Sequence, residues 1–266
     1  MPSIRPLPGL LLLVWGSMQP VQAHFPILIH DAELAATNGP VTVTYAIGHP
    51  FELELEPAAR PERVRWLDRR GRATDVTASL TKSWFRADTN AIAWKFVFDP
   101  AMDDLLVTLD SEPSSDPRQK TLYREYVKLW LYRGRQENWQ QRTGQPLEIV
   151  PLTRPYGLLP GAVFTGRLLR GDQPVADTEI YAERLNVQRP DPGSLPPEPL
   201  ITFVVRTDGD GRFALTLTDP GWWVFGAYAD DLGSVSHQGE IWRLEGFAGA
   251  WVRVEERGVL GERDQD

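Results

Sequence analysis

The sequence contains no cysteine, few histidines and no long apolar run. Without cysteine, the chain has no disulfide bonds, thiolate metal sites or cysteine nucleophiles. Four histidines and the carboxylates are left as the main transition-metal ligands. Basic residues number 28 against 36 acidic ones, and the formal net charge is −8. This balance argues against nucleic acid or an anionic membrane surface as a partner.

The first 23 residues have the features of a secretory signal peptide. Arg5 gives the positive start, Leu10 to Trp15 form the apolar stretch, and Val21-Gln22-Ala23 is a small-residue cleavage site. The apolar stretch is far shorter than the roughly 20 residues that span a bilayer. We therefore expect cleavage after Ala23 to release a periplasmic protein that begins at His24, has no membrane anchor and does not insert into the membrane.

The composition predicts an all-β fold. Proline and glycine number 23 and 22, and ten tryptophans are spread along the chain, which favours many short strands joined by turns. Alternation of apolar and polar residues, or short apolar runs between turn residues, predicts the strands. The main predicted strands are 25–30, 41–45, 51–55, 64–68, 91–99, 105–109, 127–132, 163–169, 178–183, 201–206, 213–217, 223–228 and 249–254.

A proline-rich segment divides the chain into two predicted β-sandwich domains. After the signal peptide, residues 1–23, the strands of 24–150 have the spacing of an immunoglobulin-like β-sandwich. Residues 151–160, which hold three prolines, are the predicted linker. The strands and turns of 161–256 resemble the transthyretin-like or carboxypeptidase-regulatory type of small sandwich. Residues 257–266 form a charged tail.

Histidines near the start of the mature chain suggest a metal site. As the new terminus, His24 would offer an α-amine and an imidazole, and His49 lies in a predicted bend at the same rim of the first sandwich. Three nitrogen donors in a plane suit tetragonal Ni²⁺ or Cu²⁺. Water or Glu52 is expected to supply the fourth position. The amine must lose its proton to bind, so affinity should fall as the pH drops.

The two other histidines are weaker candidates. His30 is six residues from His24, about 20 Å along a strand, and is expected to be structural or on the surface. His237 lies in the second predicted domain and joins the site only if the two domains fold onto each other.

Several motifs together resemble a known family. They are Ala23-His24-Phe25, His49-Pro50-Phe51-Glu52, the run Pro151 to Leu158, Phe164-Thr165-Gly166 and Gly221-Trp222-Trp223-x-Phe225. The chain resembles the periplasmic domain-of-unknown-function family associated with nickel uptake, which includes NikK-like accessory components of energy-coupling-factor nickel and cobalt transporters. The resemblance implies a binding protein, not an enzyme, that carries Ni²⁺ or Co²⁺ to membrane transporter components, with His24 and His49 matching the recurrent histidines.

Three alternatives stay open. Copper-resistance chaperones resembling CopC also carry a histidine at the mature terminus of an immunoglobulin-like sandwich, and Cu²⁺ outcompetes Ni²⁺ at most nitrogen sites. A pure interaction module would need no metal. A copper oxygenase of the lytic polysaccharide monooxygenase type also uses two histidines, but the sequence shows no flat aromatic platform for a sugar.

Overall fold

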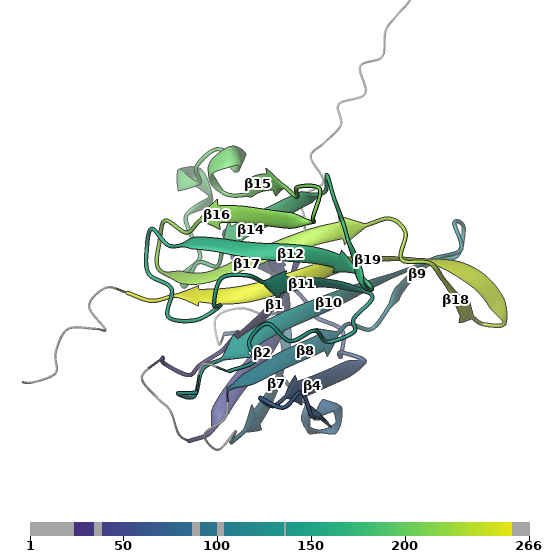
Figure 1. The fold of residues 1–266 in the computed structure, drawn as a ribbon, viewed down its shortest axis with the longest axis horizontal. Helices are drawn as coiled ribbons and strands as arrows, with labels where there is room; N and C mark the ends of the chain where they lie inside the picture. Colours follow the sequence, from purple (N-terminus) through teal and green to yellow (C-terminus); the bar gives the residue numbers. More distant parts are fainter. Residues whose placement is uncertain (1–23, 35–38, 87–90, 100–103, 136, 257–266) are drawn as a thin grey trace, which may run out of the picture.

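The computed structural model describes residues 24–34, 39–86, 91–99, 104–135 and 137–256. The predicted signal peptide, its cleavage site and the charged tail lie outside the described residues. Within these ranges the chain is β-structure with three short 3₁₀ helices, so the all-β prediction is confirmed (Figure 1). No described helix has the length and apolar character needed to cross a membrane. The 3₁₀ helices are Thr77–Ser79, Pro192–Ser194 and Glu198–Leu200.

The strands form three sheets, here named A, B and C. Sheet A contains β1 (Phe25–His30), β2 (Val41–His49), β3 (Glu54–Glu56), β6 (Thr81–Trp84) and β7 (Ile92–Phe98). Sheet C contains β11 (Leu147–Pro151), β12 (Val163–Arg170), β13 (Gln173–Pro174) and β16 (Arg212–Thr216). Sheet B contains β4 (Arg63–Leu67), β5 (Ala73–Asp75), β8 (Leu105–Asp110), β9 (Ser114–Asp116), β10 (Thr121–Leu131), β14 (Glu179–Arg184), β15 (Phe203–Arg206), β17 (Gly221–Ala229), β18 (Ser234–His237) and β19 (Glu240–Val254).

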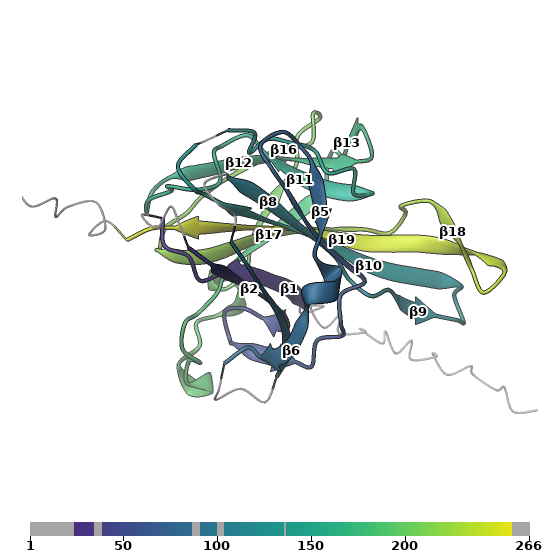
Figure 2. The ribbon, with the colours of Figure 1, turned by 90° about the horizontal axis from the view of Figure 1, so that it is seen from below.

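Sheet B lies between the other two sheets and belongs to both sandwiches. Figure 2 shows β12 and β16 on one side of β17 and β19, and β1, β2 and β6 on the other. Successive side chains of a strand point to opposite faces of a sheet. On β10, Val127 and Leu129 accordingly join the core against sheet A, while Tyr126 and Trp130 join the core against sheet C. The two predicted sandwiches are therefore present, back to back on a shared sheet.

The centre of sheet B connects distant parts of the chain. β10 pairs in parallel with β19, from Thr121 opposite Arg243 to Leu129 opposite Trp251. Sheet B thus takes strands from both predicted domains, and the predicted linker also packs closely. Leu158 is buried and bridges to Val254. How the chain divides into independently folding units stays a prediction.

A buried ion pair joins sheet B to sheet C. Lys128 on β10 alternates with apolar neighbours and yet is only 1 % exposed. Its Nζ donates to Oε2 of Glu148 on β11 at 2.5 Å, and Arg142 donates to the other carboxylate oxygen at 3.1 Å. Because sheet C covers this face of β10, the lysine needs the carboxylate to offset its desolvation.

Candidate functional site

The strand register of sheet A brings His24 and His49 together. Phe25 at the start of β1 is opposite Gly48 on β2, so the residue before it, His24, meets His49. The two imidazole centroids are 4.6 Å apart, and the rings are nearly perpendicular. His24 is half-exposed, whereas His49 is 9 % exposed. The prediction of His49 in an open bend is corrected here, because His49 is the buried last residue of β2.

Two glutamates of β3 lie beside the histidine pair. The Glu56 Oε2 atom lies 3.7 Å from His24 Nδ1, and Glu54 pairs with His49 across β2 and β3. Burial and the neighbouring His24 lower the pKa of His49, and the carboxylates of Glu52, Glu54 and Glu56 oppose that shift. With its pKa lowered, His49 is neutral at pH 7 and keeps a nitrogen lone pair, as a metal ligand requires.

Gly48 allows β3 to approach the site closely. Its φ is +147°, and a Cβ atom built there would lie 2.2 Å from the Glu54 carbonyl oxygen. Any residue larger than glycine would push β3 away from β2. The glycine therefore sets the spacing between His49 and the carboxylates of β3.

The predicted strand over 51–55 is wrong at its start. Phe51 to Leu53 form a turn, in which Leu53 has a φ of +54°, and strand pairing begins only at Glu54. Asn186 holds this turn by donating its backbone N–H to Pro50 O at 3.1 Å and its side-chain amide to Phe51 O. The three neighbouring glutamates therefore do not share one face, because Glu52 is buried while Glu54 and Glu56 are exposed.

Glu52 has a buried carboxylate neighbour that the sequence analysis missed. This is Glu183 on β14, whose pKa is raised to about 7 by burial, with the Glu52 charge adding to the rise. Thr202 donates to Glu183 Oε1 at 2.6 Å. Oε2 of Glu52 and Oε2 of Glu183 are both buried without a hydrogen-bond partner. An acidic residue among apolar ones, as at Glu52 and Glu183, can indicate a buried carboxyl group. Nothing in the sequence, however, predicts that these two residues are neighbours.

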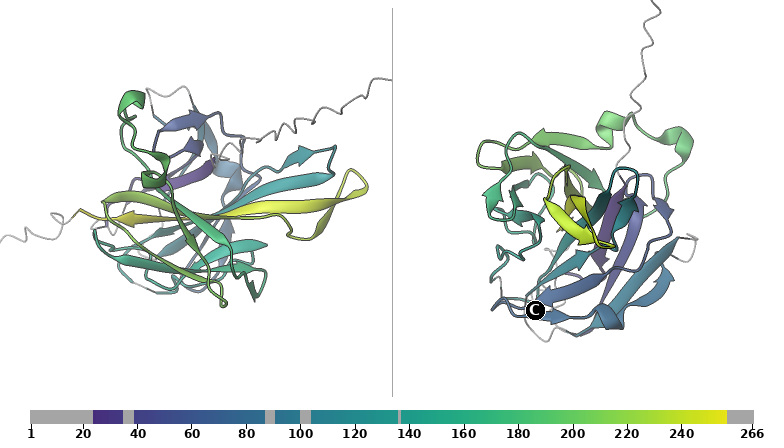
Figure 3. Two further views of the ribbon diagram at one scale, coloured as in Figure 1. Left: turned by 90° about the horizontal axis from the view of Figure 1, so that it is seen from above. Right: turned by 90° about the vertical axis from the view of Figure 1, so that its right-hand side faces the viewer.

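The structure places His30 and His237 in other surroundings. His30 packs edge-on against Trp222, and its burial lowers its pKa to about 4. His237 packs against Trp242 at the end of the β18–β19 hairpin, which extends away from the layers in Figure 3. Within the described ranges, no three histidine or carboxylate side chains are already arranged to hold a metal ion.

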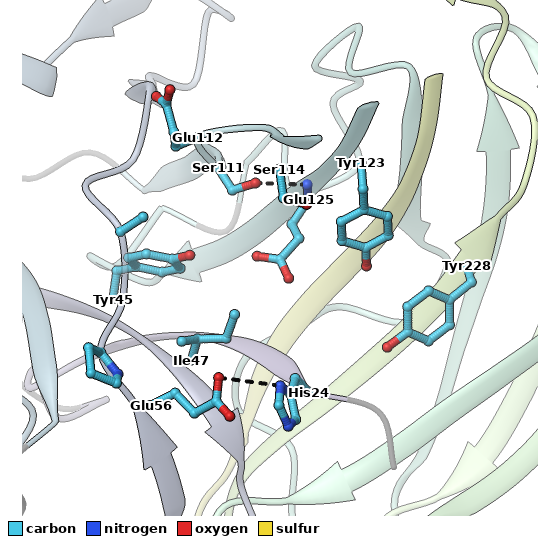
Figure 4. Close-up of a pocket in the computed structure, with 12 residues that line it drawn as sticks. His24, Tyr45, Ile47, Glu56, Ser111, Glu112, Ser114, Tyr123, Glu125 and Tyr228 are labelled. Carbon is cyan, nitrogen blue, oxygen red and sulfur yellow. Dashed lines mark hydrogen bonds and ion pairs between the residues drawn. The ribbon is translucent and has the colours of Figure 1, made fainter. Parts of the chain in front are cut away.

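A cavity of 460 Å³ opens beside His24. Its walls come from β2, β3, β10, β17 and the segment 111–114. Figure 4 shows His24 and Glu56 on one side, with the hydroxyls of Tyr45, Tyr123 and Tyr228 and the Glu125 carboxyl group pointing toward the same space. Apart from His24, these cavity residues could not be grouped from the sequence, because they come from strands that are distant in sequence.

Together, the sheets and this rim define an all-β protein with a histidine and carboxylate cluster next to a polar cavity. The family model described as Domain of unknown function (DUF4198) matches residues 21–231. The chain therefore belongs to the DUF4198 family. A comparison with curated proteins found no match.

Three solved structures show weak similarity. A "putative carbohydrate binding protein" from Pseudomonas aeruginosa is 18% identical, over 44% of this chain and 84% of that one, with a TM-score of 0.22. The D0-D1 domain of intimin is 13% identical, over 81% and 91%, with a TM-score of 0.22. A group B streptococcus pilus 2b backbone protein is 10% identical, over 85% and 98%, with a TM-score of 0.16. At these TM-scores the similarities support no inference about ligands.

Proposed function

We propose that this chain is a periplasmic carrier of a divalent transition metal, Ni²⁺ or Co²⁺, that works beside an uptake transporter. The observation that carries the proposal is the cross-strand pair of His24 and His49, with ring centroids 4.6 Å apart. Two imidazoles on neighbouring strands form a donor pair for a borderline metal ion. The transporter partner follows from the family resemblance alone.

The remaining donors are supplied at the same rim. Cleavage after Ala23 would turn the backbone nitrogen of His24 into an amine beside its own imidazole. Glu52 has a buried carboxylate oxygen without a hydrogen-bond partner, a group that gains by binding a cation. His24, His49, the terminal amine and Glu52 therefore form the proposed ligand set, with Glu56 beside His24.

Native mass spectrometry of the exported protein tests the proposal. We expect a mass that begins at His24 and one retained nickel or cobalt ion. His24→Ala and His49→Ala should each weaken binding by about 100-fold or more, because even outer-shell losses cost 10- to 100-fold. His237→Ala is the matched control and should bind as the parent does.

Two outcomes would contradict the proposal. One is a mature terminus other than His24, which would remove the amine donor. The other is metal binding that does not change when His24 or His49 is replaced.

Competition between nickel and copper must be measured with buffered free metal, because Cu²⁺ binds more tightly at most nitrogen sites regardless of the metal that the cell supplies. Binding that already falls between pH 9 and pH 7, above the imidazole reference pKa of about 6.5, would support the amine as a ligand, since its reference pKa is near 8.

A further inference from the structure

Acidic and phenolic side chains dominate the polar lining of the cavity beside His24. Glu56, Glu112 and Glu125 contribute carboxyl groups, and Tyr45, Tyr123 and Tyr228 contribute phenol rings. No lysine or arginine is among the described residues that line it. An anionic ligand would meet three acidic groups there with no lysine or arginine side chain to offset them, so the charge pattern favours a cation.

Glu125 is the buried centre of this lining. It is 6 % exposed and lies on β10, where its backbone N–H donates to Ser111 Oγ and its carbonyl accepts from the Ser111 N–H, both at 2.9 Å. The Tyr45 hydroxyl donates to its carboxyl group, which points into the cavity in Figure 4. Ser111 thus holds the backbone of Glu125, and Tyr45 holds its carboxyl group in place.

The three tyrosines surround the same space. Burial raises the pKa of Tyr123 and of Tyr228, so both hydroxyls keep their protons at neutral pH. Phenol rings attract cations through their π-faces, and their oxygens accept hydrogen bonds from N–H donors. Aromatic rings around a carboxylate form a site of the kind that binds ammonium groups.

We propose that this cavity binds a small organic cation, with its ammonium group against Glu125 and its carbon chain against the rings of Tyr45, Tyr123 and Tyr228. A volume of 460 Å³ is far larger than a bare metal ion and falls within the usual range of small-molecule sites. The proposal goes beyond the metal site and does not depend on it. His49 does not line the cavity, so the two sites can be separated by mutation.

Isothermal titration calorimetry with choline and with putrescine tests the proposal on the mature chain. At least one of them should bind, and 3,3-dimethyl-1-butanol, the uncharged isostere of choline, should bind at least about tenfold more weakly. Glu125→Gln should weaken cation binding by about tenfold or more, because it removes the carboxyl charge that faces the ammonium group. Tyr228→Leu should weaken it too, since it removes a ring but keeps an apolar side chain.

The controls separate this site from other effects. Glu240→Gln changes an exposed carboxylate outside the cavity and should leave binding unchanged. His49→Ala should weaken metal binding and leave cation binding intact. The proposal is overturned if neither cation binds at concentrations up to about 1 mM, if the neutral alcohol binds equally well, or if folded Glu125→Gln protein binds as the parent does.

Discussion

Replacing Glu125 by glutamine should stabilise the protein at alkaline pH. Burial raises the pKa of the Glu125 carboxyl group from 4.5 to about 7, while its hydrogen bond from Tyr45 opposes the rise. A carboxyl group whose pKa is raised by folding favours the native state below its unfolded pKa. That contribution is lost as the pH rises through about 7, because the native state must then bury a charge.

The size of the effect follows from the shift. A rise from 4.5 to about 7 corresponds to about 3 kcal/mol of unfolding free energy between pH 4 and pH 8. Glutamine has a similar shape, accepts the Tyr45 hydrogen bond through its carbonyl oxygen and does not titrate. The Glu125→Gln variant should therefore gain up to about 3 kcal/mol over the parent as the pH is raised from 5 to 8.

Urea unfolding of parent and variant at several pH values measures this difference. Glu183 also has a pKa raised to about 7, but it titrates in both proteins and cancels in the comparison. Glu240→Gln, at an exposed position, should show a difference that stays flat with pH. A Glu125→Gln difference that does not change between pH 5 and pH 8, or that favours the parent at pH 8, would refute the reasoning.

Two further predictions concern the packing around sheet B. Glu148→Gln should lower the unfolding free energy by about 3 to 5 kcal/mol at pH 7, because it leaves the buried Lys128 ammonium without its countercharge; an unchanged urea midpoint would contradict this. Gly226→Ala should cost about 1 to 3 kcal/mol, since the added Cβ would lie 2.1 Å from the Phe247 ring. Gly209→Ala, where a Cβ meets nothing within 4 Å, is the matched control, and equal melting temperatures for the two alanine variants would count against the packing argument.

Strand positions could be predicted from the sequence because the alternation that marks a half-buried strand is local. The first strand was predicted at its observed bounds, Phe25–His30. The parallel pairing of β10 with β19 has no local signal, since it joins residues more than 100 positions apart. The burial of Lys128 could not be predicted for the same reason. The alternation along β10 predicts that the face with Lys128 is exposed, but sheet C covers that face.

The candidate site was predictable where it depends on neighbouring strands. The proximity of His24 and His49 follows from a sandwich rim, and the register of β1 and β2 brings them opposite each other. The position of Glu52 was not predictable, because Asn186, a residue of a distant segment, holds the turn that buries it. Glu183 and Glu125 were missed because their role depends on packing across sheets.

The shared sheet also makes the last strand of the chain, β19, necessary for both cores. β10 lies at the middle of sheet B, but the strand along one of its two edges, β19, begins only at Glu240. Until β19 has paired with β10, this edge of β10 is unpaired. Trp251 of β19 belongs to the core against sheet A and Val252 belongs to the core against sheet C, so both cores are then incomplete. Both cores therefore close late and together, by a contact of high sequence separation, which is a slow kind of folding step. A chain cut short before β19 would lack the strand that completes both sandwiches.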